Sequence, residues 1–166
     1  MNAKIFRAIV VVFAGAMLLS ACQQQAEPEE TAVMDLSLES NVRFLAANAE
    51  REGVNVLPSG LQYRVIVEGE GEAPGPSDQV TVIYRGWLID GTVFDQTDPG
   101  QTAIFTTGTL IPGWVEALQL MQEGDEWEIV LPHYLAYGAQ GAGDGLIPPY
   151  QTLAFNMQLL AVNSPP

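Results

Sequence analysis

The side chains that could build a site in this chain are mostly aromatic rather than chemically reactive. The sequence contains one histidine, His133, which excludes a metal site made of several histidines. His133 follows Pro132 in a crowded turn and has no evident acid–base partner, so we interpret it as a surface loop residue. No serine–histidine–aspartate arrangement is evident either. The remaining candidates are rings and branched side chains, which either fill a core or line an apolar pocket.

Two segments call for comparison with known ligand-binding loops. The glycine-rich residues 137–145 lack a following Gly-Lys-Ser/Thr, and Asp144 would repel a phosphate, so we expect a mobile flap rather than a phosphate loop. Asp95 and Asp98 lack the ligand spacing of a calcium loop. The sequence therefore predicts no cofactor and no metal ion.

The charge of the chain limits its partners. The formal net charge is −14, and beyond Cys22 all 20 acidic residues face only four arginines and no lysine. Such a surface repels phosphate backbones, so we exclude a nucleic-acid partner. It also suggests a fold that is stabilised by salt.

The N-terminus has the pattern of an export signal. Lys4 and Arg7 precede an apolar run over residues 9–19, which is shorter than the ~20 residues of a membrane span. A transmembrane anchor remains the alternative. Residues 19–22 (LSAC) resemble the lipobox of bacterial lipoproteins, which implies cleavage after residue 21 and lipid on Cys22. Gln23 then favours the outer membrane, facing the periplasm of a Gram-negative bacterium.

The mature chain divides into three parts. Residues 22–36 are acidic and polar, as in a flexible tether. Residues 37–59 contain a helix over 37–52 and a linker, with Ser37 as N-cap. Its apolar stripe, which should pack on the following domain or on a second copy, is formed by Val42, Leu45, Ala46 and Ala49.

Residues 60–162 form the main domain. Asp90-Gly91 predicts a hairpin turn, and Pro112 stands where a helix begins. Apolar residues alternate, as in strands, over residues 61–67, 80–89, 127–131 and 152–162, and a short helix is predicted over 113–121. Several antiparallel strands with one short helix make an α+β domain.

Four sequence motifs characterise this domain more specifically than its α+β class does. They are VTVIYRGWLIDGTVFD (80–95), LIPGWVEALQLM (110–121), LPHYLAYG (131–138) and LIPPYQTLAFNMQLL (146–160). In this order they resemble the FKBP-type prolyl isomerases, across essentially all of residues 60–162. The preceding NVLPSGLQYRVIVEGEG resembles the domain entry in the macrophage infectivity potentiator group.

The resemblance implies a bent antiparallel β-sheet wrapped around one short α-helix, and it implies peptidyl-prolyl cis–trans isomerase activity. It assigns Trp114 to the floor of a pocket, and the Tyr137 hydroxyl and the Ile111 N–H to a substrate carbonyl. The residues that it implies for catalysis are Tyr84, Phe94, Asp95, Ile111 and Tyr137. Those that it implies for substrate binding are Leu110, Trp114, Leu146, Ile147 and Phe155.

The sequence departs from the family pattern at three places. Ala103 stands where the first ring of a Phe-x-Phe pair is usual, which should lower one wall and weaken binding of macrolide inhibitors. The loop from Tyr137 to Leu146 is one residue longer than is common. The N-terminal dimerisation segment is almost wholly missing, so we expect a monomer.

The implied partners are proline-containing unfolded polypeptides, together with the membrane through the lipid anchor. Two alternatives to an isomerase that assists folding of exported proteins remain open. One is a non-catalytic chaperone or binding module that uses the same cleft. The other is a surface-displayed interaction protein.

Overall fold

The computed structural model describes residues 35–163, which form one antiparallel sheet with two α-helices. The helices are α1 (Leu38–Ala49) and α2 (Pro112–Leu118). The strands are β1 (Asn55–Val56), β2 (Gln62–Val67), β3 (Gln79–Leu88), β4 (Val93–Gln96), β5 (Ala103–Thr106), β6 (Glu126–Leu131) and β7 (Leu153–Asn163). Single 3₁₀ turns are η1 (Thr107–Thr109), η2 (His133–Leu135) and η3 (Gly143–Gly145). Residues 1–21 and Cys22 lie outside the described part.

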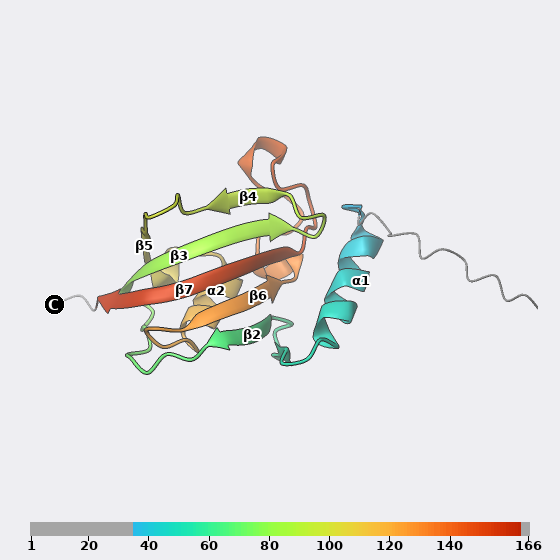
Figure 1. Cartoon of the computed structure of the whole chain (residues 1–166). Helices are drawn as coiled ribbons and strands as arrows, with labels where there is room; N and C mark the ends of the chain where they lie inside the picture. The colour runs from blue at the N-terminus through green and yellow to red at the C-terminus, as the bar shows by residue number, and fades with distance from the viewer. Residues whose placement is uncertain (1–34, 164–166) are drawn as a thin grey trace, which may run out of the picture. The chain divides into compact units, whose positions relative to one another are not determined.

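The sheet is centred on the two longest strands, β3 and β7. Its order is β1-β2-β6-β7-β3-β4, and β5 pairs with the other half of β3. Figure 1 shows β7 between β3 and β6, with α2 behind them. Every pairing is antiparallel, and the sheet does not close on itself. The predicted α+β class, a bent sheet around a short helix, is confirmed.

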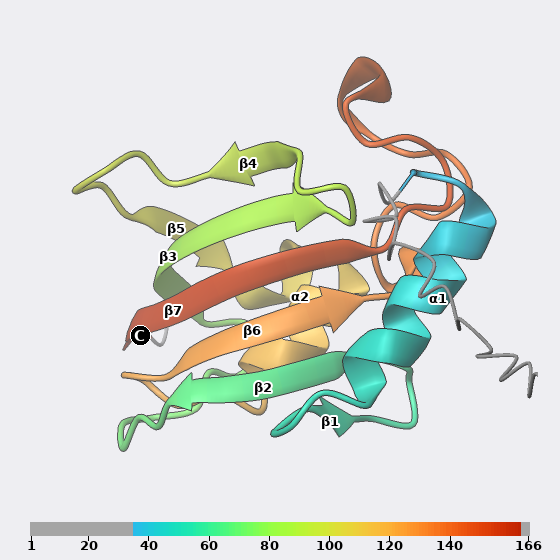
Figure 2. The same ribbon diagram turned by 45° about the vertical axis from the view of Figure 1, so that its right-hand side comes forward.

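The core lies between α2 and the sheet face that α2 covers. Alternation along β6 and β7 places Ile129 and Met157 on this face, where both are fully buried. Leu118 of α2 is also fully buried against them. Each such side chain contributes about 1.5–3 kcal/mol through removal of apolar surface from water. Turning the view shows α2 on the far side of the sheet and α1 on the near side (Figure 2).

α1 begins at the predicted residue but buries a different face from the predicted one. The Ser37 hydroxyl accepts a 3.2 Å hydrogen bond from the Ser40 N–H, so Ser37 is the N-cap. Val42 is 58% exposed and Ala46 is also exposed, so half of the predicted apolar stripe is wrong, while Leu45 and Ala49 are partly buried.

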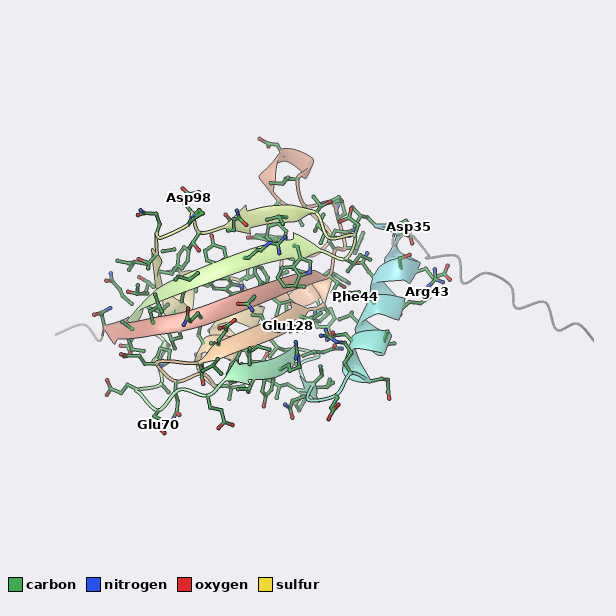
Figure 3. All side chains as sticks on the ribbon, viewed as in Figure 1. Asp35, Arg43, Phe44, Glu70, Asp98 and Glu128 are labelled. Carbon is green, nitrogen blue, oxygen red and sulfur yellow. The ribbon has the colours of Figure 1, made fainter. Side chains whose placement is uncertain are left out.

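The buried positions of α1 are polar instead. They are Ser40, Asn41 and Asn48, and only Phe44, Leu45 and Ala49 add partly buried apolar contact. Figure 3 shows Phe44 on the side of α1 toward the sheet and Arg43 on the opposite side. Apolar periodicity mispredicts the buried face of this helix because amide side chains, which can be buried when they are hydrogen-bonded, provide its docking face.

Each of the four arginines within residues 35–163 lies near an acidic or an aromatic side chain. Arg51 and Arg64 both contact Glu128, at 2.6 and 3.2 Å, and so tie α1 and β2 to β6. Arg43 lies 3.7 Å from Glu39 within α1. The Arg85 guanidinium lies 5.7 Å from the centre of the Trp87 ring.

Residues 35–163 contain neither a candidate membrane span nor a candidate metal site. No helix there is long and apolar enough to cross a membrane. No group of three or more histidine, cysteine, aspartate or glutamate side chains there is arranged to hold a metal ion.

Candidate active site

A largely aromatic cavity of about 130 Å³ opens beside α2. Its lining comes from five elements and two connecting segments, brought together only by the fold. The lining residues are Tyr84, Phe94, Asp95, Phe105, Leu110, Ile111, Trp114, Tyr137 and Phe155. Eight of these are residues that the family resemblance named, so the structure places them around one cavity.

The start of α2 fixes the floor of the cavity. Pro112 occupies the first turn, where its missing N–H costs no hydrogen bond. Ile111 before it is extended (φ −60°, ψ 146°), and its carbonyl accepts hydrogen bonds from the Trp114 and Val115 N–H groups. Within residues 35–163 the Ile111 N–H itself donates no hydrogen bond, which leaves it available to a ligand. Trp114, two residues into the helix, is only 4% exposed.

The Trp114 ring is held by edge-to-face contacts. Its ring centre lies 5.1 Å from that of Tyr84, 5.9 Å from that of Phe105 and 5.3 Å from that of Phe155. The interplanar angles are 87°, 88° and 82°. Such near-perpendicular pairs are the preferred aromatic geometry and stabilise the arrangement beyond the area they bury. The cavity therefore has a floor that is rigid before any ligand binds.

One glycine allows two walls to approach each other. Gly86 of β3 lies beside Phe94 and Phe155, whose rings pack edge to face at 5.5 Å. A Cβ on Gly86 would lie 2.7 Å from Phe94 Cζ and 2.7 Å from Phe155 Cε1. Real Cβ atoms do not make contacts this short, so any residue other than glycine at position 86 would push the two rings away from their positions.

The polar groups of the cavity are two phenols and one carboxylate. The Tyr84 hydroxyl donates a 2.6 Å hydrogen bond to Asp95 Oδ2. Burial, followed by the hydrogen bond and the negative charge of Asp95, raises the pKa of Tyr84 well above its usual value. Burial and, to a lesser extent, Asp95 also raise the pKa of Tyr137. Both phenols therefore keep their protons at neutral pH and can act as hydrogen-bond donors.

Two expected binding residues are not part of the lining. Leu146 is 51% exposed and belongs to the long loop between η2 and β7. Ile147 is buried at 6% exposure and belongs to the core, and its backbone pairs with that of Ala142. The resemblance placed them beside the cleft, and the cavity as defined above does not include them.

Phe105 is the lining residue that sequence reasoning missed. Ala103 and Phe105 are two positions apart in β5, so their side chains share one face. Ala103 packs against the core without lining the cavity, whereas Phe105 contacts Tyr84 and Trp114. The alternation of β5 is the signal that could have identified Phe105.

The sequence model described as "FKBP-type peptidyl-prolyl cis-trans isomerase" matches residues 70–160, more than half of the chain. The chain belongs to this FKBP family. A second model, "Domain amino terminal to FKBP-type peptidyl-prolyl isomerase", matches residues 13–65. Residues 13–65, which include α1, therefore match part of the amino-terminal domain of FKBP relatives.

Named FKBP relatives include longer proteins. The FKBP-type 22 kDa peptidyl-prolyl cis-trans isomerase of Escherichia coli is 52% identical over 73% of this chain and 59% of its own length. The Outer membrane protein MIP of Legionella longbeachae is 47% identical over 87% of this chain and 64% of its own length. The chain thus spans about three fifths of the length of these relatives.

Solved FKBP structures agree with the fold. FkpA from Escherichia coli superimposes with a TM-score of 0.73 at 39% identity, covering 77% of this chain and 60% of that one. A peptidyl-prolyl cis-trans isomerase from Pseudomonas syringae gives 0.71 at 38% identity, covering 76% of this chain and 93% of that one.

Proposed function

We propose that this chain is a peptidyl-prolyl cis–trans isomerase that accelerates rotation about X–Pro bonds in unfolded polypeptides. The observation that carries the proposal is the aromatic cavity, which is large enough for a proline ring and has hydrogen-bond donors at its edge. Family membership and the activity in the names of its relatives support the same conclusion.

The reaction suits a site without nucleophile or metal. No covalent bond is broken, and the barrier of ~18–20 kcal/mol comes from amide resonance. The planar amide is more polar than the twisted transition state, so removal from water costs the transition state less. Donors that fit the rotated carbonyl add binding that exists only in the transition state.

Each lining residue has a proposed role. Trp114 supports the proline ring, and Tyr84, Phe94, Phe105, Leu110 and Phe155 enclose it. The Ile111 N–H and the Tyr137 hydroxyl donate to carbonyl oxygens of the substrate. Asp95 orients Tyr84 through the 2.6 Å hydrogen bond and keeps a negative charge at the edge of the cavity. Leu146 contacts residues that flank the proline, while Ile147 anchors its loop in the core.

The test is NMR exchange between cis and trans forms of a proline-containing tetrapeptide. Wild-type protein should raise the exchange rate above that in buffer, and Asp95→Ala and Tyr137→Phe should lower it. Tyr134→Phe is the matched control, because Tyr134 is 59% exposed and outside the cavity. A wild-type rate equal to that in buffer would exclude the isomerase. Binding of the peptide without faster exchange would instead establish the alternative, a non-catalytic chaperone or binding module.

The proposed location is an outer membrane, with the chain held at Cys22 by lipid and facing the periplasm. The support is the LSAC pattern at residues 19–22 and the name of the Legionella relative. Two or more acyl chains would make such anchoring stable. Mass spectrometry of the membrane fraction should find a lipid-modified N-terminal Cys22, and Cys22→Ser should abolish it. An unmodified thiol on Cys22 would refute the anchor.

We further propose that the chain works as a monomer on exported proteins and binds macrolide inhibitors weakly. Sedimentation at micromolar concentration should give the monomer mass, and a stable dimer would contradict this. The weak inhibitor binding rests on Ala103, so Ala103→Phe should tighten it in a titration.

A further inference from the structure

α1 is fastened to the main domain by two buried pairs of amide side chains. In one pair, Asn41 Nδ2 donates to Gln151 Oε1 at 3.2 Å. In the other, Asn48 Nδ2 donates to Gln62 Oε1 at 2.7 Å. All four side chains are at most 5% exposed. The two pairs have the same chemistry but reach different parts of the domain, since Gln62 begins β2 and Gln151 lies two residues before β7.

The Asn41 pair is embedded in further hydrogen bonds. Asn41 Oδ1 accepts from the Thr152 N–H at 2.7 Å. Gln151 Nε2 donates to the Leu36 carbonyl at 3.0 Å and to the Pro149 carbonyl at 3.1 Å. The polar atoms of both amides are thereby satisfied in a buried place, where any unpaired one would be costly. The cluster holds residues 149–152 against the N-terminal half of α1.

Residues 149–152 include the C-terminal end of the loop over residues 138–150. Tyr150 has a positive φ of 63°, which is uncommon for a residue with a side chain. Its N–H donates to the Gly138 carbonyl at 2.8 Å and so joins the two ends of the loop. Gly138 directly follows Tyr137, whose hydroxyl belongs to the cavity. In Figures 1 and 2 the two ends of this loop, in orange, lie beside the N-terminal end of α1.

A continuous chain of contacts thus links the helix to the cavity. It runs from Asn41 to Gln151, along the backbone to Tyr150, across to Gly138 and into Tyr137. By contrast, Asn48 donates to Gln62 of β2, whose amide returns to the Leu45 carbonyl of α1 itself. Asn48 Oδ1 accepts from Arg51, which contacts Glu128 of β6, and Glu128 does not line the cavity. Neither Gln62 nor any other β2 residue lines the cavity.

We propose that Asn41 is a positioning residue: through Gln151 it fixes the loop over residues 138–150 and thereby the place of the Tyr137 hydroxyl. Asn48 fastens the same helix without this effect. The inference rests on the proposed function for its catalytic consequence, whereas its effect on the loop is independent of activity.

The experiment compares Asn41→Ala with Asn48→Ala in the full chain. Each variant removes one buried amide from the same helix, so both should lose thermal stability. The amide hydrogens of Tyr150 and Ile147, which close the loop, should exchange roughly tenfold faster or more in Asn41→Ala and at the wild-type rate in Asn48→Ala. The ring signals of Tyr137 should shift in the first variant only.

Catalysis gives the second readout. The kcat/KM for a proline-containing peptide should fall several-fold in Asn41→Ala, mainly through KM, and stay unchanged in Asn48→Ala. If Asn41→Ala does not fold, Gln151→Met replaces it, because that variant keeps the hydrogen bond from Thr152 to Asn41. It should show the same changes in the loop and in kcat/KM.

The outcomes separate the two ideas. Loop amides that exchange equally in Asn41→Ala and Asn48→Ala would overturn the positioning role. Faster loop exchange with unchanged kcat/KM would overturn the link to Tyr137. Absence of catalysis in the wild type would remove the proposed function, and the exchange and ring signals would still decide whether Asn41 positions the loop.

Discussion

The Tyr84 hydroxyl donates a 2.6 Å hydrogen bond to Asp95 Oδ2 across the β3–β4 pair. This bond joins the phenol that contacts the Trp114 ring to the carboxylate in the cavity. It orients both groups before a substrate arrives, so neither has to be ordered during the reaction. Preorganised polar groups of this kind stabilise a transition state without a reorganisation cost.

Replacing Tyr84 by Phe should slow X–Pro exchange by about tenfold, the effect of losing a charge-assisted hydrogen bond of roughly 1.5 kcal/mol or more. The aromatic contact with Trp114 is kept, so the unfolding midpoint should change little. NMR exchange and thermal unfolding measure the two effects. An unchanged exchange rate would show that Asp95 needs no orientation by Tyr84.

The activity should be constant from neutral pH up to about pH 9, below the ordinary tyrosine pKa of about 10. The folded protein raises the pKa of Tyr84 and of Tyr137, so both remain protonated there. Because folding raises both pKa values, the two phenols contribute fully to the stability of the folded protein at any pH below the tyrosine pKa of the unfolded chain. This contribution is lost as the pH rises toward the raised pKa values of the folded protein.

Absorbance of tyrosinate as a function of pH checks this directly. Tyr84→Phe should remove a phenol that ionises well above the usual tyrosine range. A decline of exchange rate between neutral pH and about pH 9 would contradict the protonation assigned to the two phenols.

Gly86→Ala should close part of the cavity, because the new methyl group would overlap Phe94 and Phe155. We expect a loss of about 1–3 kcal/mol in the free energy of unfolding, together with slower exchange. Adding Phe94→Leu should recover stability but not activity, since it removes one of the overlapping rings and one wall. Denaturant unfolding of the single and double variants measures the effect. A fully stable Gly86→Ala would mean that the rings can move apart.

Salt should raise the stability of the folded chain. Glu128 already serves both Arg51 and Arg64, which leaves few cations for the remaining acidic residues. Exposed charges of one sign repel each other, and this repulsion is screened as ionic strength rises. The unfolding temperature should therefore increase from low to molar salt, with sodium chloride as the probe. No gain would show that acidity here serves solubility alone.

Long regular alternation made most of the sheet predictable. β3 and β7 are ten and eleven residues long, so their buried faces repeat often enough to be recognised. β1 has only two residues and carries no period. The start of α1 was predicted correctly from its Ser37 N-cap, but its docking face was not. Asparagine is usually solvent-exposed, so an apolar stripe in the sequence does not include the buried asparagines.

The cavity was predictable only through family motifs, since Trp114 and Phe155 look like ordinary core residues in the sequence. Phe105 was missed because a single ring in a four-residue strand gives too short a period to separate a cavity residue from a core residue. The burial of Ile147 depends on how the loop folds back onto Ala142, and no local pattern encodes that return.

The pairing of β3 with β7 also determines how the chain must fold. Leu88 pairs with Leu153 and Gln79 with Asn163, so the centre of the sheet is closed by its last strand. Such a high contact order predicts folding on the order of milliseconds to seconds rather than microseconds. A chain that emerges from a membrane N-terminus first would therefore keep both β3 and β6 without their shared neighbour until residues 153–163 arrive. For the proposed exported isomerase, folding would then follow the completion of export.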